Sequence, residues 1–273
     1  KNLGLPLPTK VSPAFGSIQE HVVGDIAEFF DFIANVVPEH LELLQPDLVT
    51  IVAKFYAVFL GNQTYVNQAH LRSQFVQVLW QFTPDRRKKP SPFFNVFVVD
   101  PTSEQLMVPA LTSYFIDMQD ENPYALGQRR HQVWQIMKNL WAAAPHRKTF
   151  EKFGASDPFR RYCMLLINDA LDHLDSAREH MATVFDLKVK KADDGFEQLP
   201  QQERQEIVRS LRHEEQLAKA YSEYGTGAVA ALALYSTTVT EPFSEPELAT
   251  RLAGMVNFNI TELMTRRAGP VQG

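Results

Sequence analysis

Apolar residues recur three or four positions apart along most of the chain, which is the spacing of one face of a helix. The first such stripe covers residues 18–36 and ends before Pro38. Residues 48–60 are apolar nearly all round and stop at Gly61, which predicts a helix in the centre of the fold. A third stripe covers residues 71–82 and has a polar opposite face. The first third of the chain is therefore predicted to form three helices.

Residues 84–105 break this spacing. They contain several prolines, a basic run at 86–89 and a β-prone stretch at 93–99, so we expect a loop with an extended insert. Helical spacing returns at residues 108–118 and again at 126–141. The short link between these two segments predicts that they pack together as a hairpin.

The second half of the chain contains the longest helical stripes. One covers residues 159–184 and follows Asp157 and Pro158, which read as an N-cap and a first helical residue. The next opens after Leu199-Pro200 and continues to residue 235. It carries Gly225 and Gly227, where a neighbour can approach closely or the helix can bend.

The last predicted helix covers residues 248–263 and is preceded by the capping-box pair Ser244 and Glu247. Helices thus follow one another with no alternation of strand and helix, which favours an all-α fold, either an α-solenoid or an irregular bundle. Composition agrees, since the 273 residues are 45% hydrophobic and include only 12 glycines. This length suffices for one large domain or two small ones.

Charge and cysteine content narrow the class of protein further. A net charge of -5 provides no global field for phosphate backbones, so we expect no nucleic acid as main partner. The single cysteine, Cys163, allows no internal disulfide and no cysteine-rich zinc site, which fits a reducing compartment. The longest apolar stretch, residues 228–235, is too short to span a bilayer, so no membrane insertion is expected.

Common enzyme signatures are missing: the sequence has no phosphate-binding P-loop, no dinucleotide-binding glycine motif, no zinc-protease motif and no nucleophile elbow. Cys163 could act as a nucleophile, but its place on an apolar stripe favours a small buried thiol. Asp169, His173 and His180 lie near one face of a predicted helix and could ligate a metal. Partner ligands are not evident, so a solvated face is favoured. We therefore predict no catalytic, cofactor-binding or metal-binding residue.

Two further features of the sequence allow both a functional interpretation and a purely structural one. The basic run Arg86, Arg87, Lys88 and Lys89 could be a nuclear-import signal or a patch for an acidic partner, while a solvated loop is the simpler interpretation. Asn168, Asn257 and Asn259 are amides among apolar residues and need hydrogen-bond partners if they are buried. The simpler reading is that they tie neighbouring helices and loops together.

Several of these stretches carry a family resemblance. The segments PFRRYCMLLINDALDHLDSA at 158–177 and TEPFSEPELATRLAGMVNFNITEL at 240–263 resemble two blocks of the ubiquitin elongation factor core. Further similarity lies at 68–80, 106–119 and 198–224, in the family's order. The signature positions, for which a structural role is expected, are Asn168, Asp169, Pro242, Glu247, Asn257 and Asn259.

The resemblance implies an armadillo-like helical solenoid and a parent protein that is a U-box ubiquitin-protein ligase. Such ligases elongate ubiquitin chains on substrates already carrying ubiquitin, for proteasomal degradation and in endoplasmic-reticulum-associated degradation. Their implied partners are a ubiquitin-conjugating enzyme bound through the U-box, ubiquitinated substrates and the AAA segregase of the valosin-containing type. The implied location is the cytoplasm, the nucleus or both.

We expect residues 1–273 to be part of one core domain, with the U-box C-terminal to Gly273. The segment would then serve as a scaffold and docking surface, and we expect it not to be catalytic by itself. The alternative is a non-enzymatic armadillo or HEAT-like adaptor or transport scaffold whose parent lacks a U-box. A third hypothesis is a helical enzyme that uses Cys163.

Overall fold

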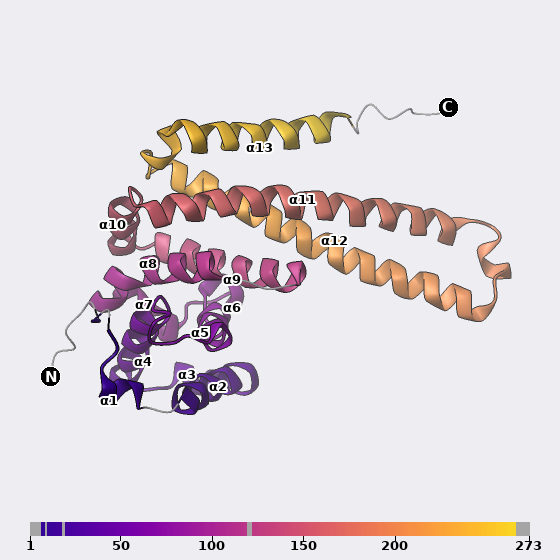
Figure 1. The fold of residues 1–273 in the computed structure, drawn as a ribbon. Helices are drawn as coiled ribbons and strands as arrows, with labels where there is room; N and C mark the ends of the chain where they lie inside the picture. Colours follow the sequence, from indigo (N-terminus) through magenta and orange to yellow (C-terminus); the bar gives the residue numbers. More distant parts are fainter. Residues whose placement is uncertain (1–6, 9, 18–19, 119–121, 266–273) are drawn as a thin grey trace. The chain divides into compact units, whose positions relative to one another are not determined.

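The computed structural model describes residues 7–8, 10–17, 20–118 and 122–265. These residues form α-helices and short 3-10 helices, and they contain no β-strand (Figure 1). In chain order the elements are α1 (Pro13–Gly16), α2 (Glu20–Val36), α3 (Pro38–Glu42), α4 (Pro46–Phe59), α5 (Ala69–Gln81), α6 (Pro84–Arg87), α7 (Pro92–Val99), α8 (Pro101–Asp117), α9 (Pro123–Trp141), α10 (Ala144–Phe153), α11 (Asp157–Ala192), η1 (Phe196–Gln198), α12 (Gln201–Ser236), η2 (Pro242–Ser244) and α13 (Pro246–Thr265).

The predicted all-α scaffold is confirmed, as an irregular series of packed helices whose lengths range from 4 to 36 residues. Within the described ranges, no helix combines the length and the apolar composition that crossing a membrane requires. The chain divides into two compact units, residues 1–162 and residues 163–273, and the division falls inside α11.

The first unit is built on helices that the apolar stripes predicted. In it α2 packs on α5, α5 packs on α9, and α4 packs on α8. Its centre is aromatic: the rings of Tyr56 on α4 and Phe75 on α5 stack at 4.6 Å, and Phe97 lies 5.9 Å from Tyr56. All three side chains are fully buried, which explains why residues 48–60 are apolar on nearly every side. The predicted contact between residues 108–118 and 126–141 is confirmed by the packing of α8 on α9.

The extended insert expected at residues 93–99 is wrong, because this stretch is the helix α7. Ser91 caps it by accepting a hydrogen bond from the Phe94 amide at 3.1 Å, and Pro92 occupies its first turn. Helical spacing buries Phe93, Phe94 and Phe97 together. Burial of these rings outweighs the β-propensity of the sequence.

A helix that the sequence did not reveal, α10, follows α9. Its ten residues are mostly polar, and its buried residues are His146 and Phe150, so its apolar periodicity is weak. Phe150 lies 4.9 Å from the ring of Trp141, and the His146 imidazole is 3.2 Å from the Phe97 carbonyl oxygen. These tertiary contacts hold α10 against its neighbours.

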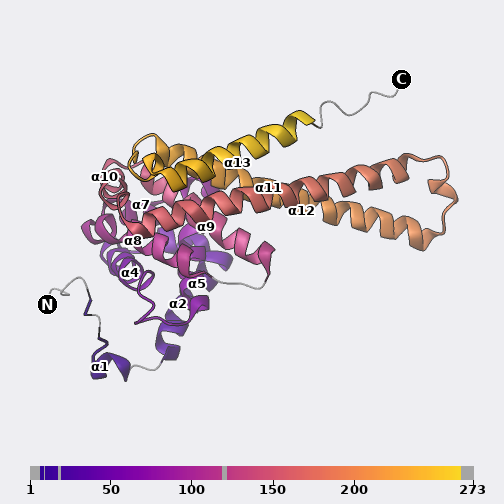
Figure 2. The same cartoon turned by 45° about the horizontal axis from the view of Figure 1, so that its top comes forward.

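In the second unit, α11 and α12 run side by side in opposite directions and are joined through η1 (Figure 2). The pair is tied along its length by His180 with Glu214, at 2.6 Å, and by Lys188 with Glu215, at 2.8 Å. On the other side of α11, Arg178 donates to the Asn259 side chain of α13 at 3.4 Å and lies over the Phe258 ring. The unit is therefore a long helical hairpin with a third helix packed on it.

Two helix starts differ from the sequence prediction. Ser156, not Asp157, caps α11: its hydroxyl oxygen accepts from the Phe159 amide at 3.3 Å, and Asp157 is the first helical residue. The expected capping box before α13 is absent among the described contacts: α13 begins at Pro246, so Ser244 is not the residue next to the helix, and its hydroxyl donates to the Thr240 carbonyl at 3.0 Å. Ser244 ends η2, so it is already committed to the preceding turn.

Candidate functional site

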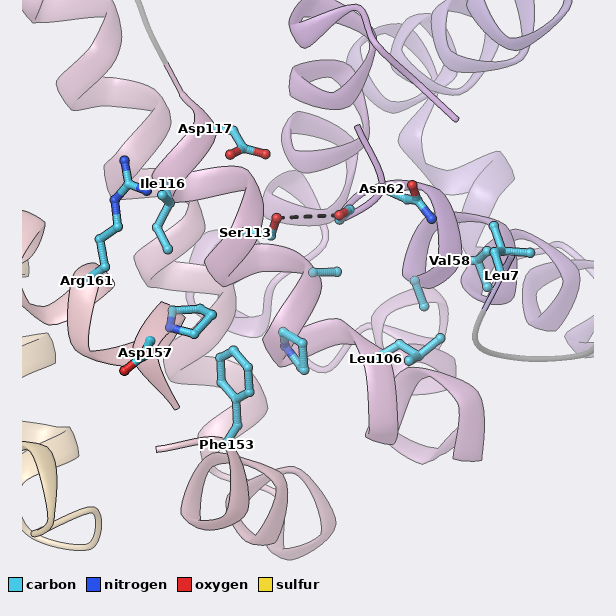
Figure 3. A pocket seen from close by; sticks show the side chains of 15 residues that line it. Leu7, Val58, Asn62, Leu106, Ser113, Ile116, Asp117, Phe153, Asp157 and Arg161 are labelled. Carbon is cyan, nitrogen blue, oxygen red and sulfur yellow. Dashed lines mark hydrogen bonds between the residues drawn. The ribbon is translucent and has the colours of Figure 1, made fainter. Parts of the chain in front are cut away.

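The first unit carries a groove of about 570 Å³ on its surface (Figure 3). Its walls come from the end of α4 and the turn that follows, from one face of α8, from the end of α10 and from the start of α11. Residues far apart in the sequence thus meet here, among them Leu7, Val58, Leu106, Phe153 and Arg161.

A close backbone contact shapes the floor of this groove. A Cβ at Gly61 would lie 2.6 Å from the Cα of Ala110, so the turn after α4 fits against α8 only because residue 61 is glycine. The Ser113 hydroxyl faces the Gly61 carbonyl oxygen at 3.5 Å, as Figure 3 shows. Pro109 also lines the groove; it lies inside α8 and has no N–H to donate to the preceding turn. The floor of the groove therefore depends on a close backbone contact that any side chain at position 61 would prevent.

The charges of the groove gather at one end. In Figure 3, Asp117, Ile116 and Arg161 lie at the end away from Leu7 and Val58. The Asp117 carboxylate accepts from the fully buried Arg72 at 3.3 Å. Arg72 also lies 5.5 Å from the ring centre of Tyr114. Burial raises the pKa of the Tyr114 hydroxyl to about 12. The buried Arg72 therefore positions the Asp117 carboxylate.

Arg161 is the available cation of the groove. It is exposed, and among the described residues no carboxylate lies within 4 Å of its guanidinium. The neighbouring Asp157 pairs instead with Arg160, at 2.9 Å. The two carboxylates of the lining, Asp117 and Asp157, are paired with Arg72 and Arg160. An apolar hollow with a free cation at its end suits the binding of a partner's side chains.

The candidate nucleophile Cys163 does not have the surroundings of a reactive thiol. Its side chain is fully buried, and burial raises the pKa of the thiol well above its ordinary value. The thiolate is the nucleophilic form, so this environment suppresses the reactivity that a transferase would need. The buried-thiol interpretation accounts for its position on the apolar stripe.

The candidate metal ligands are not on a solvated face, contrary to expectation. Asp169 and His173 are buried and His180 is half-buried, because α12 covers this side of α11. The Tyr221 ring stacks on His180 at 5.4 Å and lies 5.7 Å from His173. In the parts of the chain that the structure describes, no three His, Cys, Asp or Glu side chains are gathered as a ligand set.

The six family-signature positions all lie in the second unit but on different elements. Asn168 is exposed on α11 beside the buried Asp169, and Pro242 is buried in η2. Glu247, in the first turn of α13, and Asn257 are exposed. Asn259 accepts from Arg178 on α11 and donates to the Met255 carbonyl at 3.0 Å. The structural roles expected of the six positions stay predictions.

The groove in the first unit was not predicted from the sequence. Its lining residues are mostly ordinary apolar side chains drawn from separate segments, so no local motif marks it. The available signals were Gly61, read as a helix stop, and Pro109 inside a helical stripe. Both are typical of close approach or irregular packing, but the sequence does not show which residues lie against them.

Comparison of this sequence with known proteins identifies the family of the chain. The ubiquitin elongating factor core matches residues 1–270. The chain is 26% identical over 271 residues to the "Probable ubiquitin conjugation factor E4" of Arabidopsis thaliana, covering 95% of this chain and 25% of that protein. It is 24% identical over 291 residues to "Ubiquitin conjugation factor E4 A" of Rattus norvegicus, covering 99% and 27%.

A more distant match is the "E4 ubiquitin-protein ligase UFD2" of Saccharomyces cerevisiae, 21% identical over 230 residues, which are 80% of this chain and 24% of that protein. The chain thus spans about a quarter of the length of the curated relatives it matches. The family match runs through both compact units and leaves out only the last three residues. This chain belongs to the ubiquitin elongating factor core family.

Proposed function

We propose that this chain is the core segment of a ubiquitin-protein ligase that elongates ubiquitin chains on already ubiquitinated substrates. The observation that carries the proposal is the match of residues 1–270 to the ubiquitin elongating factor core. The matched relatives are named as ubiquitin conjugation factors and as a ubiquitin-protein ligase. In this proposal transfer is promoted by a U-box elsewhere in the parent protein, and the present segment supplies scaffold and docking surface.

The groove between α4, α8, α10 and α11 is the docking surface that we assign to this role. Its apolar walls give affinity by removing a partner's hydrophobic side chain from water, and Arg161 selects an acidic group beside that side chain. At the same end of the groove, the Asp117 carboxylate is paired with Arg72 at 3.3 Å, and no ion pair of Arg161 forms among the described residues.

The finer functional statements rest on the family resemblance. We propose that a ubiquitin-conjugating enzyme binds the parent protein through its U-box and that the AAA segregase of the valosin-containing type is a partner. Proteasomal degradation, including degradation of endoplasmic-reticulum substrates, is then the proposed outcome. Cytoplasmic and nuclear locations follow from the same proposal.

A ubiquitination assay tests the proposal directly. The full-length protein, its Arg161→Glu variant and the 273-residue chain are each incubated with activating and conjugating enzymes and a ubiquitin-primed substrate. Lys148→Glu is the matched control, because Lys148 is exposed on α10, does not line the groove and changes the charge equally. We expect chain extension by the full-length protein and by Lys148→Glu, several-fold slower extension by Arg161→Glu, and none by the 273-residue chain.

Other results would change the proposal. If the full-length protein extends no chain with any conjugating enzyme, the adaptor alternative replaces the ligase. Equal rates for Arg161→Glu and Lys148→Glu would remove the groove from the docking role. Extension by the 273-residue chain alone would place catalytic chemistry within this segment.

A further inference from the structure

A second hollow in the first unit is lined mainly by polar and positively charged side chains, whereas the groove is lined mainly by apolar ones. It measures about 610 Å³ and is lined mainly by residues of α2, α5, α6 and α9 and of the turn after α6. Its lining is polar: amide side chains from α2, α5 and α9 face the arginines of α6 and the lysine that follows. Three residues of the basic run singled out in the sequence, Arg86, Arg87 and Lys89, therefore line a concave surface.

Aromatic rings position the two arginines of this wall. The Arg86 guanidinium lies 4.7 Å from the ring centre of Trp80, and that of Arg87 lies 5.2 Å from the ring centre of Phe82. Lys88 then adopts φ 57°, a left-handed conformation that turns the chain after α6. A guanidinium stacked on a ring still presents its N–H edge, which matches a carboxylate in two parallel hydrogen bonds.

The carboxylates near this hollow already have hydrogen-bond or ion-pair partners. Glu42 accepts from the Ser91 hydroxyl at 2.8 Å and from the Phe93 amide at 3.1 Å, and Arg87 reaches it only at 3.9 Å. Asp85 is paired with Lys138 at 2.7 Å. In the described part of the chain, no carboxylate lies within 4 Å of the charged groups of Arg86 or Lys89. The hollow therefore has a surplus of positive charge.

An amide that is open to the hollow lies in its lining. Gln132 on α9 is 6% exposed as a whole, its amide atoms are not shut off from solvent, and no hydrogen bond to its side chain forms among the described residues. Its neighbours contrast with it: Gln81 donates to Asn35 at 2.8 Å, and Gln135 accepts from the Trp80 indole N–H. Because the Gln132 amide reaches the hollow and has no protein partner among the described residues, it is available to donate to and accept from a bound group.

We propose that this hollow binds an acidic peptide segment of a partner protein. The peptide's carboxylates would pair with Arg86 and Lys89, and its backbone would hydrogen-bond the side chain of Gln132. An extended peptide offers carboxylates and backbone amides together, which is the combination that these side chains complement. The chain's net charge of -5 works against a nucleic acid in the same place. This inference does not depend on the groove or on the ligase activity.

Fluorescence anisotropy with the intact 273-residue chain tests the proposal. The probe is a labelled short peptide that alternates Asp and Ser, and the comparison peptide carries Asn in place of Asp. Binding is measured for wild type, Arg86→Gln, Lys89→Gln and Gln132→Leu. Lys88→Gln is the matched control, because Lys88 is adjacent to Lys89 but does not line the hollow.

We expect the acidic peptide to bind and the Asn peptide to bind at least about tenfold more weakly. Arg86→Gln and Gln132→Leu should each weaken binding by about tenfold, whereas Lys88→Gln should change it less than twofold. Circular dichroism confirms that each variant is folded. Gln132→Leu removes an unpaired amide and should unfold no more easily than wild type.

The proposal is overturned if wild type binds both peptides equally or binds neither. It is also overturned if Lys88→Gln weakens binding as much as Lys89→Gln, since that would show unspecific attraction. Tighter binding of a labelled single-stranded oligonucleotide than of the acidic peptide would assign the hollow to nucleic acid instead.

Discussion

The backbone of Gly225 on α12 lies directly against Leu174 on α11. A Cβ at position 225 would come 2.6 Å from the Leu174 Cγ and 3.0 Å from its backbone nitrogen. Such distances are too short for real contacts, so a side chain here would push the two helices apart. The sequence allowed a bend or a close approach at this glycine, and the structure shows the close approach.

Replacing Gly225 with alanine should therefore destabilise the second unit, although alanine is the better helix former. We expect a loss of roughly 1–3 kcal/mol in the free energy of unfolding, measured by urea denaturation followed by circular dichroism. Gly254→Ala is the control, because nothing lies within 4 Å of a Cβ at that position on α13. It should gain up to about 1 kcal/mol. Stabilisation by both substitutions would refute the close packing.

Removing the Asp117 carboxylate should lower the free energy of unfolding, because it leaves the buried Arg72 charge without its ion-pair partner. Arg72 is 1% exposed, and Asp117 is its ion-pair partner at 3.3 Å. We expect Asp117→Ala to lower the free energy of unfolding by about 2–4 kcal/mol, because an unpaired guanidinium is left inside the first unit. The double variant Arg72→Met with Asp117→Ala should recover more than half of this loss. If both variants are equally unstable in urea, the penalty comes from the lost contacts and not from the unpaired charge.

Acid should weaken the first unit through His146. Burial lowers the pKa of this imidazole, and the hydrogen bond with the Phe97 carbonyl opposes this only in part. The folded protein therefore holds His146 neutral, while the unfolded chain takes up a proton below about pH 6.5. Stability from this residue is full above that pH and falls as the pH drops, by at most about 1.4 kcal/mol per pH unit.

Urea denaturation near pH 7.5 and near pH 5.5 measures this effect. His146→Gln retains an N–H donor for the Phe97 carbonyl but cannot titrate, so its loss of stability in acid should be smaller than that of wild type. His213→Gln, at an exposed position on α12, should behave as wild type does. An unchanged pH dependence in His146→Gln would show that other groups cause the acid sensitivity.

The helix α7 should depend on its capping serine. The Ser91 hydroxyl accepts from the Phe94 amide and donates to Glu42 at 2.8 Å, and the residue is 4% exposed. We expect Ser91→Ala to cost roughly 1–2 kcal/mol, because a buried amide and a half-buried carboxylate oxygen both lose a partner. Ser12→Ala, at the exposed cap of α1, should cost less. Equal effects in thermal unfolding would contradict the role assigned to Ser91.

The sequence by itself determined the helical class and the position of most long helices. Stripes of apolar residues at helical spacing define α2, α4, α5, α8, α9, α11, α12 and α13, because each must bury one face and its periodicity records that need. The family resemblance could also be read from local segments, above all residues 158–177 and 240–263.

Tertiary structure decided what local patterns leave open. Residues 93–99 have β-propensity but form α7, because Ser91 caps them and three phenylalanines share one buried side. The polar α10 forms because Trp141 and Phe97 provide partners for Phe150 and His146. Propensity acts within a few residues, whereas the free energy of burial depends on what lies opposite.

Both proposed binding surfaces belong to this second category. The groove needs Gly61 against Ala110, and the basic hollow brings Arg86, which lies over Trp80, together with Gln132. The sequence shows each of these residues but not which of them meet, because their contacts join segments that are distant along the chain. Their chemistry arises from the packing of helices, so only the folded chain reveals it.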